Sequence, residues 1–351
     1  MAQRCCSKCF TDKNLREKIH NLGKIQRCIY CRSNEESTIE TSELFNLITP
    51  IIEVIETNYR ESETGLNIAE ILKIEFSLFN PLTNIHALVK DTFYEHKPLL
   101  LDKKFELLSQ DLDNGWEELK AELINKNRFF PQTILYKEAF LEQGNLFNIF
   151  TNVIEELNYE ITTSDQLFRA RISEQILQNG EMKQPPNDKV TFGRANPDGI
   201  PYLYAAETLD TCLTEVRPAN GQQVNIVSIN PICDFKVIDL RTPRKNISFL
   251  SLAENDDNFD FKNILKLVNL LEDFSRELSL PVLPHRSRLD YIPTQFITEF
   301  FKNIGDLKGL VFQSSFGKGF NVVIFDQELI DWQKTLSTQQ IRINGVDLKY
   351  E

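Results

Sequence analysis

Three side-chain types that can do chemistry together lie close in the stretch FGRANPDGIPYLYAAETLDTCLTEVRP at residues 192–218. A turn signal, Asn-Pro-Asp-Gly, separates Arg194 from a short apolar strand expected around Tyr204. A helix is predicted next, because apolar residues then recur at i, i+3, i+4 and i+7. Glu215 falls at the rim of that apolar stripe, where a carboxylate is partly desolvated, as functional acids often are. The sequence therefore predicts a cation, a phenol and a carboxylate at one site.

Other cations and hydroxyls of the same half are candidates for this site. Arg169 and Arg171 alternate with apolar residues in FRARI, so both are expected on one face of a strand. Ser314 and Ser315 end an apolar run and begin the glycine-containing loop SSFGKG. Guanidinium groups bind phosphate in bidentate fashion, and hydroxyls beside free backbone N–H groups also hold phosphate.

The reaction class follows from what accompanies the carboxylate. His285 is the only histidine of the C-terminal half, so a Ser-His-Asp hydrolase is not indicated, and neither a P-loop nor G-x-G-x-x-G occurs. One carboxylate among phosphate-binding groups fits cleavage of a glycosidic bond in a nucleotide, because such a carboxylate stabilises an oxocarbenium-like transition state.

Each assignment has a purely structural alternative. The two strand arginines could form a solvated face, Tyr204 could be core, and Ser314 could cap a turn. Arg217 could pair with Glu215 and make that acid an inert member of an ion pair.

A different chemistry is concentrated at the N-terminus, in two C-x-x-C pairs. Cys6 and Cys9 form the first, Cys28 and Cys31 the second, with eighteen residues between them. This spacing predicts a tetrahedral, structural Zn²⁺ site, and the metal would supply folding energy that a short basic segment lacks. Cys5 could replace Cys6 as a ligand, and the alternative for the whole set is free cytosolic thiols.

The elements that must position these groups change character along the chain. Residues 37–160 show apolar residues at helical spacing, with Thr49-Pro50 marking a helix start. From about residue 161 the period shifts toward two, with strands expected at 202–205, 224–229, 235–240, 309–313 and 320–325 and helices at 257–278 and 293–304. We expect an α+β fold in three parts: a zinc-ribbon-like module (1–36), a helical domain (37–160) and a catalytic α/β domain (161–351).

Bulk properties exclude some functions. A length of 351 residues predicts two or three domains, and a net charge of −12 argues against wholesale binding to nucleic acid or acidic membranes. Residues 1–36 run the other way, with eight Lys/Arg against four acids, so nucleic-acid binding by this segment stays open. Neither a signal peptide nor a membrane-spanning apolar run is visible, which predicts a soluble cytoplasmic protein.

Residues about 165–335 resemble the RES domain family, named for an arginine, a glutamate and a serine. The family pattern is Gly-Arg-x-Asn, a tyrosine ten residues after the arginine and a glutamate eleven further on, here Arg194, Asn196, Tyr204 and Glu215.

The opening and closing family motifs are also present. FRAR matches the opening arginine at Arg169, and VFQSSFGKGFNVVIF resembles the closing motif with Ser314 favoured over Ser315, although Gln313 stands where many members have proline.

The resemblance implies a fold akin to ADP-ribosyltransferases and consumption of NAD⁺. The implied reaction is often phosphorolysis, with inorganic phosphate as co-substrate and nicotinamide and ADP-ribose 1″-phosphate as products. Many members are toxins of toxin–antitoxin pairs, so an antitoxin or other regulatory partner is implied, and a homo-oligomer is possible. Residues 1–160 resemble the HEPN/RES-type N-terminal domain, but the HEPN ribonuclease signature is absent, so no RNase activity is predicted.

The resemblance implies a role for each matched residue. Arg169 and Arg194 would grip the pyrophosphate or the attacking phosphate. Tyr204 would stack on or hydrogen-bond the nicotinamide ribose, Glu215 would stabilise the oxocarbenium, and Ser314 would orient the amide or a phosphate oxygen. Their neighbours would assist in substrate binding: Arg171, Asn196 and Ser315.

Two rival functions remain. The enzyme could transfer ADP-ribose to a macromolecule instead of phosphate or water. Alternatively, a zinc-ribbon protein could bind nucleic acid or a partner and carry an inactive RES-like scaffold.

Overall fold

The computed structural model describes residues 3–108, 114–255, 260–280, 287–333 and 338–345. His285 lies outside the described residues. The chain forms two compact units, one of Met1–Asn114 with Pro243–Asn269 and the other of Gly115–Thr242 with Leu270–Glu351. None of the described helices is long and apolar enough to cross a membrane.

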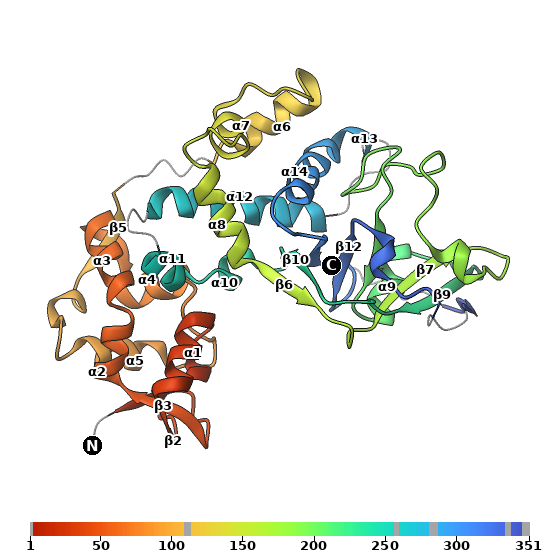
Figure 1. Cartoon of the computed structure of the whole chain (residues 1–351). Coiled ribbons are helices and arrows are strands. Elements are labelled where there is room, and N and C mark those ends of the chain that lie inside the picture. The colour runs from red at the N-terminus through yellow and green to blue at the C-terminus, as the bar shows by residue number, and fades with distance from the viewer. Residues whose placement is uncertain (1–2, 109–113, 256–259, 281–286, 334–337, 346–351) are drawn as a thin grey trace. The chain divides into compact units, whose positions relative to one another are not determined.

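The first unit begins with a three-stranded antiparallel sheet in the order β1-β3-β2 (Figure 1). Its elements are β1 (Arg4–Cys6), η1 (Ser7–Cys9), α1 (Lys13–Leu22), β2 (Lys24–Gln26) and β3 (Glu36–Glu40). Asp12 caps α1, since its carboxylate accepts a hydrogen bond from the backbone N–H of Leu15 at 2.9 Å. Leu15 and Ile19 are fully buried, so α1 presents one apolar face to the interior.

The remainder of this unit is mostly helical. The helices are α2 (Thr41–Leu47), α3 (Thr49–Asn58), α4 (Ile68–Ile74), α5 (Ile85–Phe93), η2 (Pro98–Leu100), α10 (Pro243–Asn246) and α11 (Phe249–Asn255). The helix start predicted at Thr49-Pro50 is confirmed, with Thr49 as the first residue of α3 and Ile48 as both the C-cap of α2 and the N-cap of α3.

One antiparallel pair interrupts these helices and was not predicted. It consists of β4 (Tyr59–Asn67) and β5 (Lys104–Leu107). The β4 sequence YRESETGLN is mostly polar and only Tyr59 in it is buried, so it lacks the apolar alternation that marks a half-buried strand.

The second unit contains an eight-stranded mixed sheet in the order β13-β9-β7-β8-β12-β11-β10-β6. The strands are β6 (Asn158–Ile161), β7 (Leu167–Ile172), β8 (Leu203–Ala206), β9 (Gln223–Ile229), β10 (Phe235–Asp239), β11 (Gly309–Gln313), β12 (Phe320–Ile324) and β13 (Gln339–Arg342). Only β10 and β11 pair in parallel among these neighbours.

The helices of this unit are α6 (Trp116–Asn125), α7 (Ile134–Ala139), α8 (Phe147–Glu156), η3 (Asn179–Met182), α9 (Leu209–Val216), α13 (Ser287–Asp290), α14 (Ile292–Asn303) and η4 (Gln327–Leu329). The long helix α12 (Phe261–Ser279) begins in the first unit and ends in the second.

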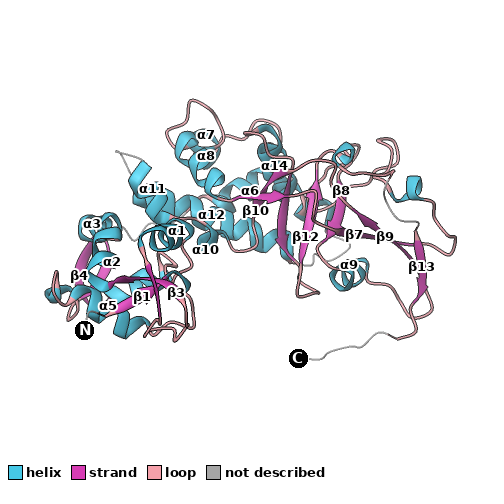
Figure 2. Cartoon of the chain, turned by 60° about the horizontal axis from the view of Figure 1, so that its bottom comes forward, coloured by secondary structure: helices cyan, strands magenta, loops and turns pink. Residues whose placement is uncertain are grey.

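Alternating residues of β7 separate two cores. Leu167 packs with Met182 in the larger core, whereas Ala170 lies with Cys212 of α9 in a smaller one, with Phe168 against it. Helix α9 therefore covers one face of the sheet at β7 and β8 (Figure 2). This face carries the candidate site.

The mixed α+β fold predicted from the sequence is confirmed. The predicted strands are present as β7, β8, β9, β10, β11 and β12, and the predicted helices are present as α9, α12 and α14. The apolar stripe of α9 is narrower than predicted, because Leu209 in its first turn is 40% exposed. The edge strands β6 and β13 were not predicted, because their short sequences are half polar.

Candidate active site

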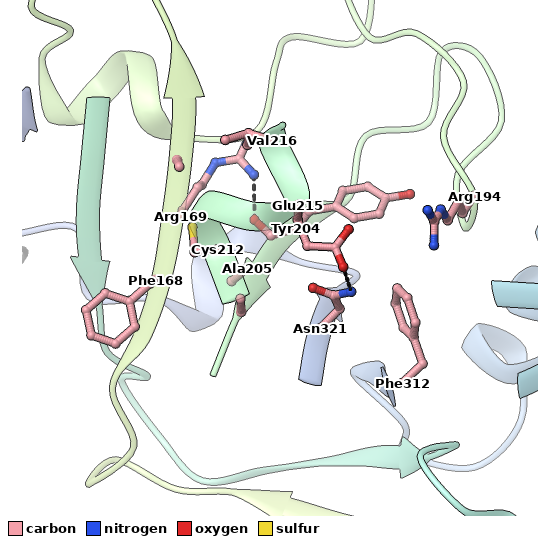
Figure 3. A pocket seen from close by; sticks show the side chains of 12 residues that line it. Phe168, Arg169, Arg194, Tyr204, Ala205, Cys212, Glu215, Val216, Phe312 and Asn321 are labelled. Atoms are coloured by element: carbon pink, nitrogen blue, oxygen red, sulfur yellow. Dashed lines mark hydrogen bonds between the residues drawn. The ribbon is translucent and has the colours of Figure 1, made fainter. Parts of the chain in front are cut away.

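The carboxylate of Glu215 is the centre of the site. Thr208 caps α9 by accepting a hydrogen bond from the N–H of Thr211, and Glu215 lies in the last turn. Glu215 Oε1 accepts hydrogen bonds at 2.7 Å from Ser314 Oγ and at 2.7 Å from Asn321 Nδ2 (Figure 3). No described residue donates to Oε2, so one oxygen is held and the other stays available.

Ser314 is fixed as a donor to Glu215. Its hydroxyl oxygen accepts hydrogen bonds from the backbone N–H groups of Phe316 at 3.1 Å and Gly317 at 3.0 Å. A hydroxyl has one proton, and with its lone pairs occupied by these N–H groups that proton points to Glu215. Ser314 thus caps its turn, as the structural alternative expects, and also holds the acid. Its expected role toward the nicotinamide amide or a phosphate oxygen stays a prediction.

Glycines bring the loop after Ser314 onto the first turn of α9. A Cβ atom on Gly317 would lie 2.8 Å from Thr211 Oγ1, and one on Gly319 would lie 2.7 Å from the same atom. The N–H of Gly319 donates to Thr211 Oγ1 at 3.2 Å. The close approach therefore requires residues without side chains, and it fixes Ser314 relative to the helix that carries Glu215.

Arg169 is a buried cation at the point where β7 and β8 separate. The two strands pair only at Phe168 and Ala206. The Arg169 guanidinium donates to the carbonyls of Tyr204 and Met182, both at 2.6 Å. Its side chain is buried and no described carboxylate pairs with it. Burial, and then the charge of Arg171, lower the pKa of Arg169 to about 9, so it remains protonated at neutral pH.

Tyr204 is held by the loop that precedes β8. Its hydroxyl donates to Asn196 Oδ1 at 2.8 Å and accepts from the N–H of Ala195 at 3.1 Å. A Cβ on Gly193 would lie 2.7 Å from that hydroxyl, so the family glycine is required by close packing. Burial raises the pKa of Tyr204 to about 12, so the phenol stays neutral.

Arg194 lies across the pocket from Glu215 (Figure 3). One nitrogen, Nη1, donates to the carbonyls of Leu278 at 2.6 Å and Ser279 at 3.0 Å at the C-terminal end of α12. A cation is favoured at this negative end of a helix. Helix α14 supports the same loop, since Thr294 Oγ1 donates to the carbonyl of Arg194.

These groups line one pocket of about 230 Å³. The predicted residues in its wall are Arg169, Arg194, Tyr204 and Glu215. Apolar walls come from Phe168, Ala170, Ala205, Ala206, Cys212, Val216 and Phe312.

The other predicted residues do not line this pocket. Arg171 donates to the carbonyls of Glu181 and Lys183 and thereby holds η3 on the sheet. Asn196 lies behind Tyr204, and the exposed Ser315 donates to the carbonyl of Ser279.

The ion pair considered between Arg217 and Glu215 is not formed. The Arg217 guanidinium lies 4.1 Å from the ring centroid of Phe316, in a cation–π contact. Arg217 ends α9 with a left-handed backbone, φ 47°, which turns the chain away after the helix. Glu215 is therefore held by hydrogen bonds from Ser314 and Asn321 and not by an ion pair with Arg217.

Phe312 and Asn321 are pocket residues that come from strands in which the sequence analysis placed no site residue. Both lie in strands that read as buried and apolar, and they are directly paired across β11 and β12. The one available signal was the single asparagine in FNVVI, a polar residue in a buried strand.

The N-terminal cysteines form a second site. The sulfur atoms of Cys6, Cys9, Cys28 and Cys31 all lie within 4.8 Å of one another, as a tetrahedral metal site requires. Cys5 is not in this group, because successive residues of β1 point to opposite sides. Burial raises the pKa of the Cys5 thiol, which keeps it neutral. The geometry thus selects Cys6 over Cys5.

Fold and pocket together define a class of protein: a mixed-sheet domain that holds one carboxylate in a pocket lined by two arginines. Residues 166–343 match the model of the RES domain, and the chain belongs to the RES domain family. The match does not reach the N-terminal segment, whose resemblance to HEPN/RES-type domains stays a prediction.

A chain in the crystal structure of the M. tuberculosis MbcT–MbcA toxin–antitoxin complex is similar at 13% sequence identity with a TM-score of 0.28, covering 55% of this chain and 91% of that chain. No curated protein matches this sequence.

Proposed function

We propose that this protein consumes NAD⁺ by cleaving the bond between nicotinamide and ribose, through phosphorolysis or hydrolysis. The observation that carries the proposal is the geometry of Glu215. Ser314 and Asn321 hold its Oε1, and its Oε2 is available in a pocket that Arg169 and Arg194 also line. An anchored carboxylate beside two cations suits a substrate that combines phosphates with a sugar developing positive charge.

The reaction balances without a redox step. The bond from ribose C1″ to the nicotinamide nitrogen breaks, and its electron pair leaves with the now neutral nicotinamide. Positive charge develops on the ribose, where Glu215 stabilises it. An oxygen of phosphate or water then bonds to C1″, giving ADP-ribose 1″-phosphate, or ADP-ribose and a proton.

Arg169 and Arg194 are assigned to the phosphates of the substrate or to the attacking phosphate. Neither arginine forms an ion pair with a carboxylate among the described residues. Each donates to backbone carbonyls through only part of its guanidinium, so other N–H groups are left for an anion. A buried cation without a counter-ion is costly unless an anion joins it, so substrate binding would relieve that cost at Arg169.

Tyr204 is assigned a packing role. Its hydroxyl is already engaged by Asn196 and Ala195, which favours the ring as the surface that meets the nicotinamide ribose. The pocket volume, about 230 Å³, is below the roughly 300–1,000 Å³ of sites that enclose whole drug-sized ligands. We therefore expect it to enclose the nicotinamide-ribose end of NAD⁺ with the adjoining or attacking phosphate, and not the adenosine end.

The cysteine cluster is assigned to a structural Zn²⁺. Four thiolates satisfy the tetrahedral preference of zinc and leave no position for a substrate, so the ion would contribute folding energy to the N-terminal sheet. A role as toxin or defence effector, controlled by an antitoxin or other protein and with a possible homo-oligomer, is proposed from the family alone.

The test compares wild type, Glu215→Gln and the matched control Asp210→Asn, an exposed acid on the same helix. Each is incubated with NAD⁺ with and without phosphate, and products are identified by mass spectrometry. We expect wild type and the control to release nicotinamide, and Glu215→Gln to lose about 10²–10³ of kcat, as when a transition-state contact is removed.

The products also decide among the acceptors. ADP-ribose 1″-phosphate indicates phosphorolysis, free ADP-ribose indicates hydrolysis, and label from NAD⁺ retained on protein or nucleic acid indicates ADP-ribosyl transfer. Unchanged NAD⁺ with wild type would refute the enzyme and favour a zinc-ribbon binding protein.

A further inference from the structure

Asn321 is a polar residue in a fully buried strand, where apolar residues are usual. It lies in β12, FNVVI, all of whose residues are buried, and only 6% of Asn321 is exposed. Its backbone is part of the ladder that pairs it with Ala206 and Phe312, so the side chain is not needed to satisfy the strand. Burying a side-chain amide costs free energy unless its N–H and C=O groups form hydrogen bonds.

One half of that amide positions the acid. Asn321 Nδ2 donates to Glu215 Oε1 at 2.7 Å, from the side of the sheet, while Ser314 Oγ donates to the same oxygen from the loop. Two donors from different elements fix the rotation of the carboxylate. This leaves Oε2 as the oxygen presented to the pocket.

The other half of the amide is available for a ligand. The donor to the carboxylate must be Nδ2, because an amide oxygen there would face another acceptor. Oδ1 therefore lies on the side of the amide away from Glu215 (Figure 3). Asn321 lines the pocket, and none of the described residues donates to Oδ1.

We propose that Asn321 is a positioning and specificity residue for the reaction at Glu215: Nδ2 orients the carboxylate, and Oδ1 accepts a hydrogen bond from a ribose hydroxyl of the substrate. The inference rests on the proposed function and adds a substrate requirement. A pocket with a buried acceptor discriminates against an analogue that lacks the matching donor, because the acceptor is then left unpaired.

The test uses Asn321→Leu, which keeps the shape, and Asn321→Asp, which places a second carboxyl beside Glu215. Asn303→Ala, at an exposed position on α14, is the control. Each protein is assayed with NAD⁺ and with an NAD⁺ analogue lacking the 2″-hydroxyl of the nicotinamide ribose, from pH 5 to pH 8, with Tm measured in parallel.

For Asn321→Leu we expect kcat on NAD⁺ to fall about 10- to 100-fold with KM changed less, since the acid is misoriented. The preference of wild type for NAD⁺ over the deoxy analogue should shrink by about tenfold or more in this variant.

For Asn321→Asp we expect activity to be low at pH 8 and to recover toward pH 5. Two adjacent carboxyls share a proton, and the protonated one then donates to Glu215 as the amide did. The charged and titratable groups around this position are Glu215 and Cys212 from α9, Arg169 from β7, Tyr204 from β8 and Arg194 from its loop. Burial raises the pKa of Tyr204 and of Cys212 to about 12, so neither titrates in this range.

The outcomes separate the two proposals. Wild-type kcat in Asn321→Leu, or a pH profile of Asn321→Asp that follows wild type, would overturn the positioning role while NAD⁺ consumption stands. Unchanged discrimination against the deoxy analogue in Asn321→Leu would overturn the role of Oδ1. If wild type leaves NAD⁺ intact, the proposed function fails and this inference fails with it.

Discussion

The cysteine cluster and the Glu215 pocket are built in opposite ways. The four sulfur atoms come from two C-x-x-C pairs within the first 31 residues and use one residue type. The pocket takes its polar groups from β7, the loop before β8, β8 itself, α9 and β12, which spread from residue 169 to residue 321. The first site is set by local spacing, and the second exists only once the sheet order β7-β8-β12-β11 is formed.

The two sites also differ in how their groups are satisfied. The four sulfurs have the arrangement that a metal ion would complete, whereas Glu215 is held by two neutral donors and has one oxygen without a donor among the described residues. Loss of one cysteine should therefore disrupt the fold of its segment. Loss of one pocket group should affect chemistry more than stability.

Removal of the metal should give the largest effect. Structural zinc sites in small modules supply about 10–16 kcal/mol of apparent binding energy, so a chelator or Cys28→Ser should unfold the N-terminal sheet. Metal content per chain and far-UV circular dichroism measure this. Cys5→Ser is the control and should keep its zinc. Stoichiometric zinc in Cys28→Ser would show that the four sulfurs are not the ligands.

Arg169→Met should abolish activity without a matching loss of stability. Two carbonyls lose a donor, at about 1–3 kcal/mol each, but the variant also removes a desolvated cation, so we expect unfolding free energy to fall by less than about 2 kcal/mol. Urea unfolding and NAD⁺ turnover give the two numbers. Arg171→Met, on the same strand face, should retain most of the turnover. Equal turnover in Arg169→Met and wild type would contradict a role of Arg169 in substrate binding or catalysis.

The two adjacent serines should behave differently. Ser314→Ala leaves the N–H groups of Phe316 and Gly317 without their acceptor and removes one of the two donors to Glu215. We therefore expect about 1–3 kcal/mol lower stability and about tenfold lower kcat. Ser315→Ala, at an exposed position, should change stability by less than about 0.5 kcal/mol. If Ser315→Ala has the larger kinetic effect, the assignment of the family serine to Ser314 is wrong.

The phenol of Tyr204 should make the free energy of unfolding depend on pH under alkaline conditions. Its pKa is raised by burial to about 12 in the folded state, above the unfolded value near 10, so its contribution is complete below pH 10 and is lost as the pH rises toward 12. The stability difference between wild type and Tyr204→Phe should thus narrow by about 2–3 kcal/mol over this range. Chemical denaturation at stepped pH measures it, and a constant difference would contradict the buried, neutral phenol.

Much of the second unit was predictable, because its central strands are apolar runs with clear turn signals. Turn signals mark where the elements with the family residues begin or end. They are Asn-Pro-Asp-Gly before β8, the proline after α9 and the glycines after β11. The pairing of β4 with β5 was not predictable, since a polar strand with little buried surface has no hydrophobic period that separates it from a loop. The division into segments 1–36, 37–160 and 161–351 stays a prediction.

The sequence by itself determined the local features of both sites. The C-x-x-C pairs, the helical position of Glu215 and the turn before Tyr204 all follow from spacing within a few residues, where backbone geometry is nearly fixed. The tertiary structure alone decided that Cys6 and not Cys5 joins the cluster, that Arg217 stacks on Phe316, and that Asn321 holds Glu215. Such choices depend on strand register and on contacts between residues about a hundred positions apart, which local spacing does not encode.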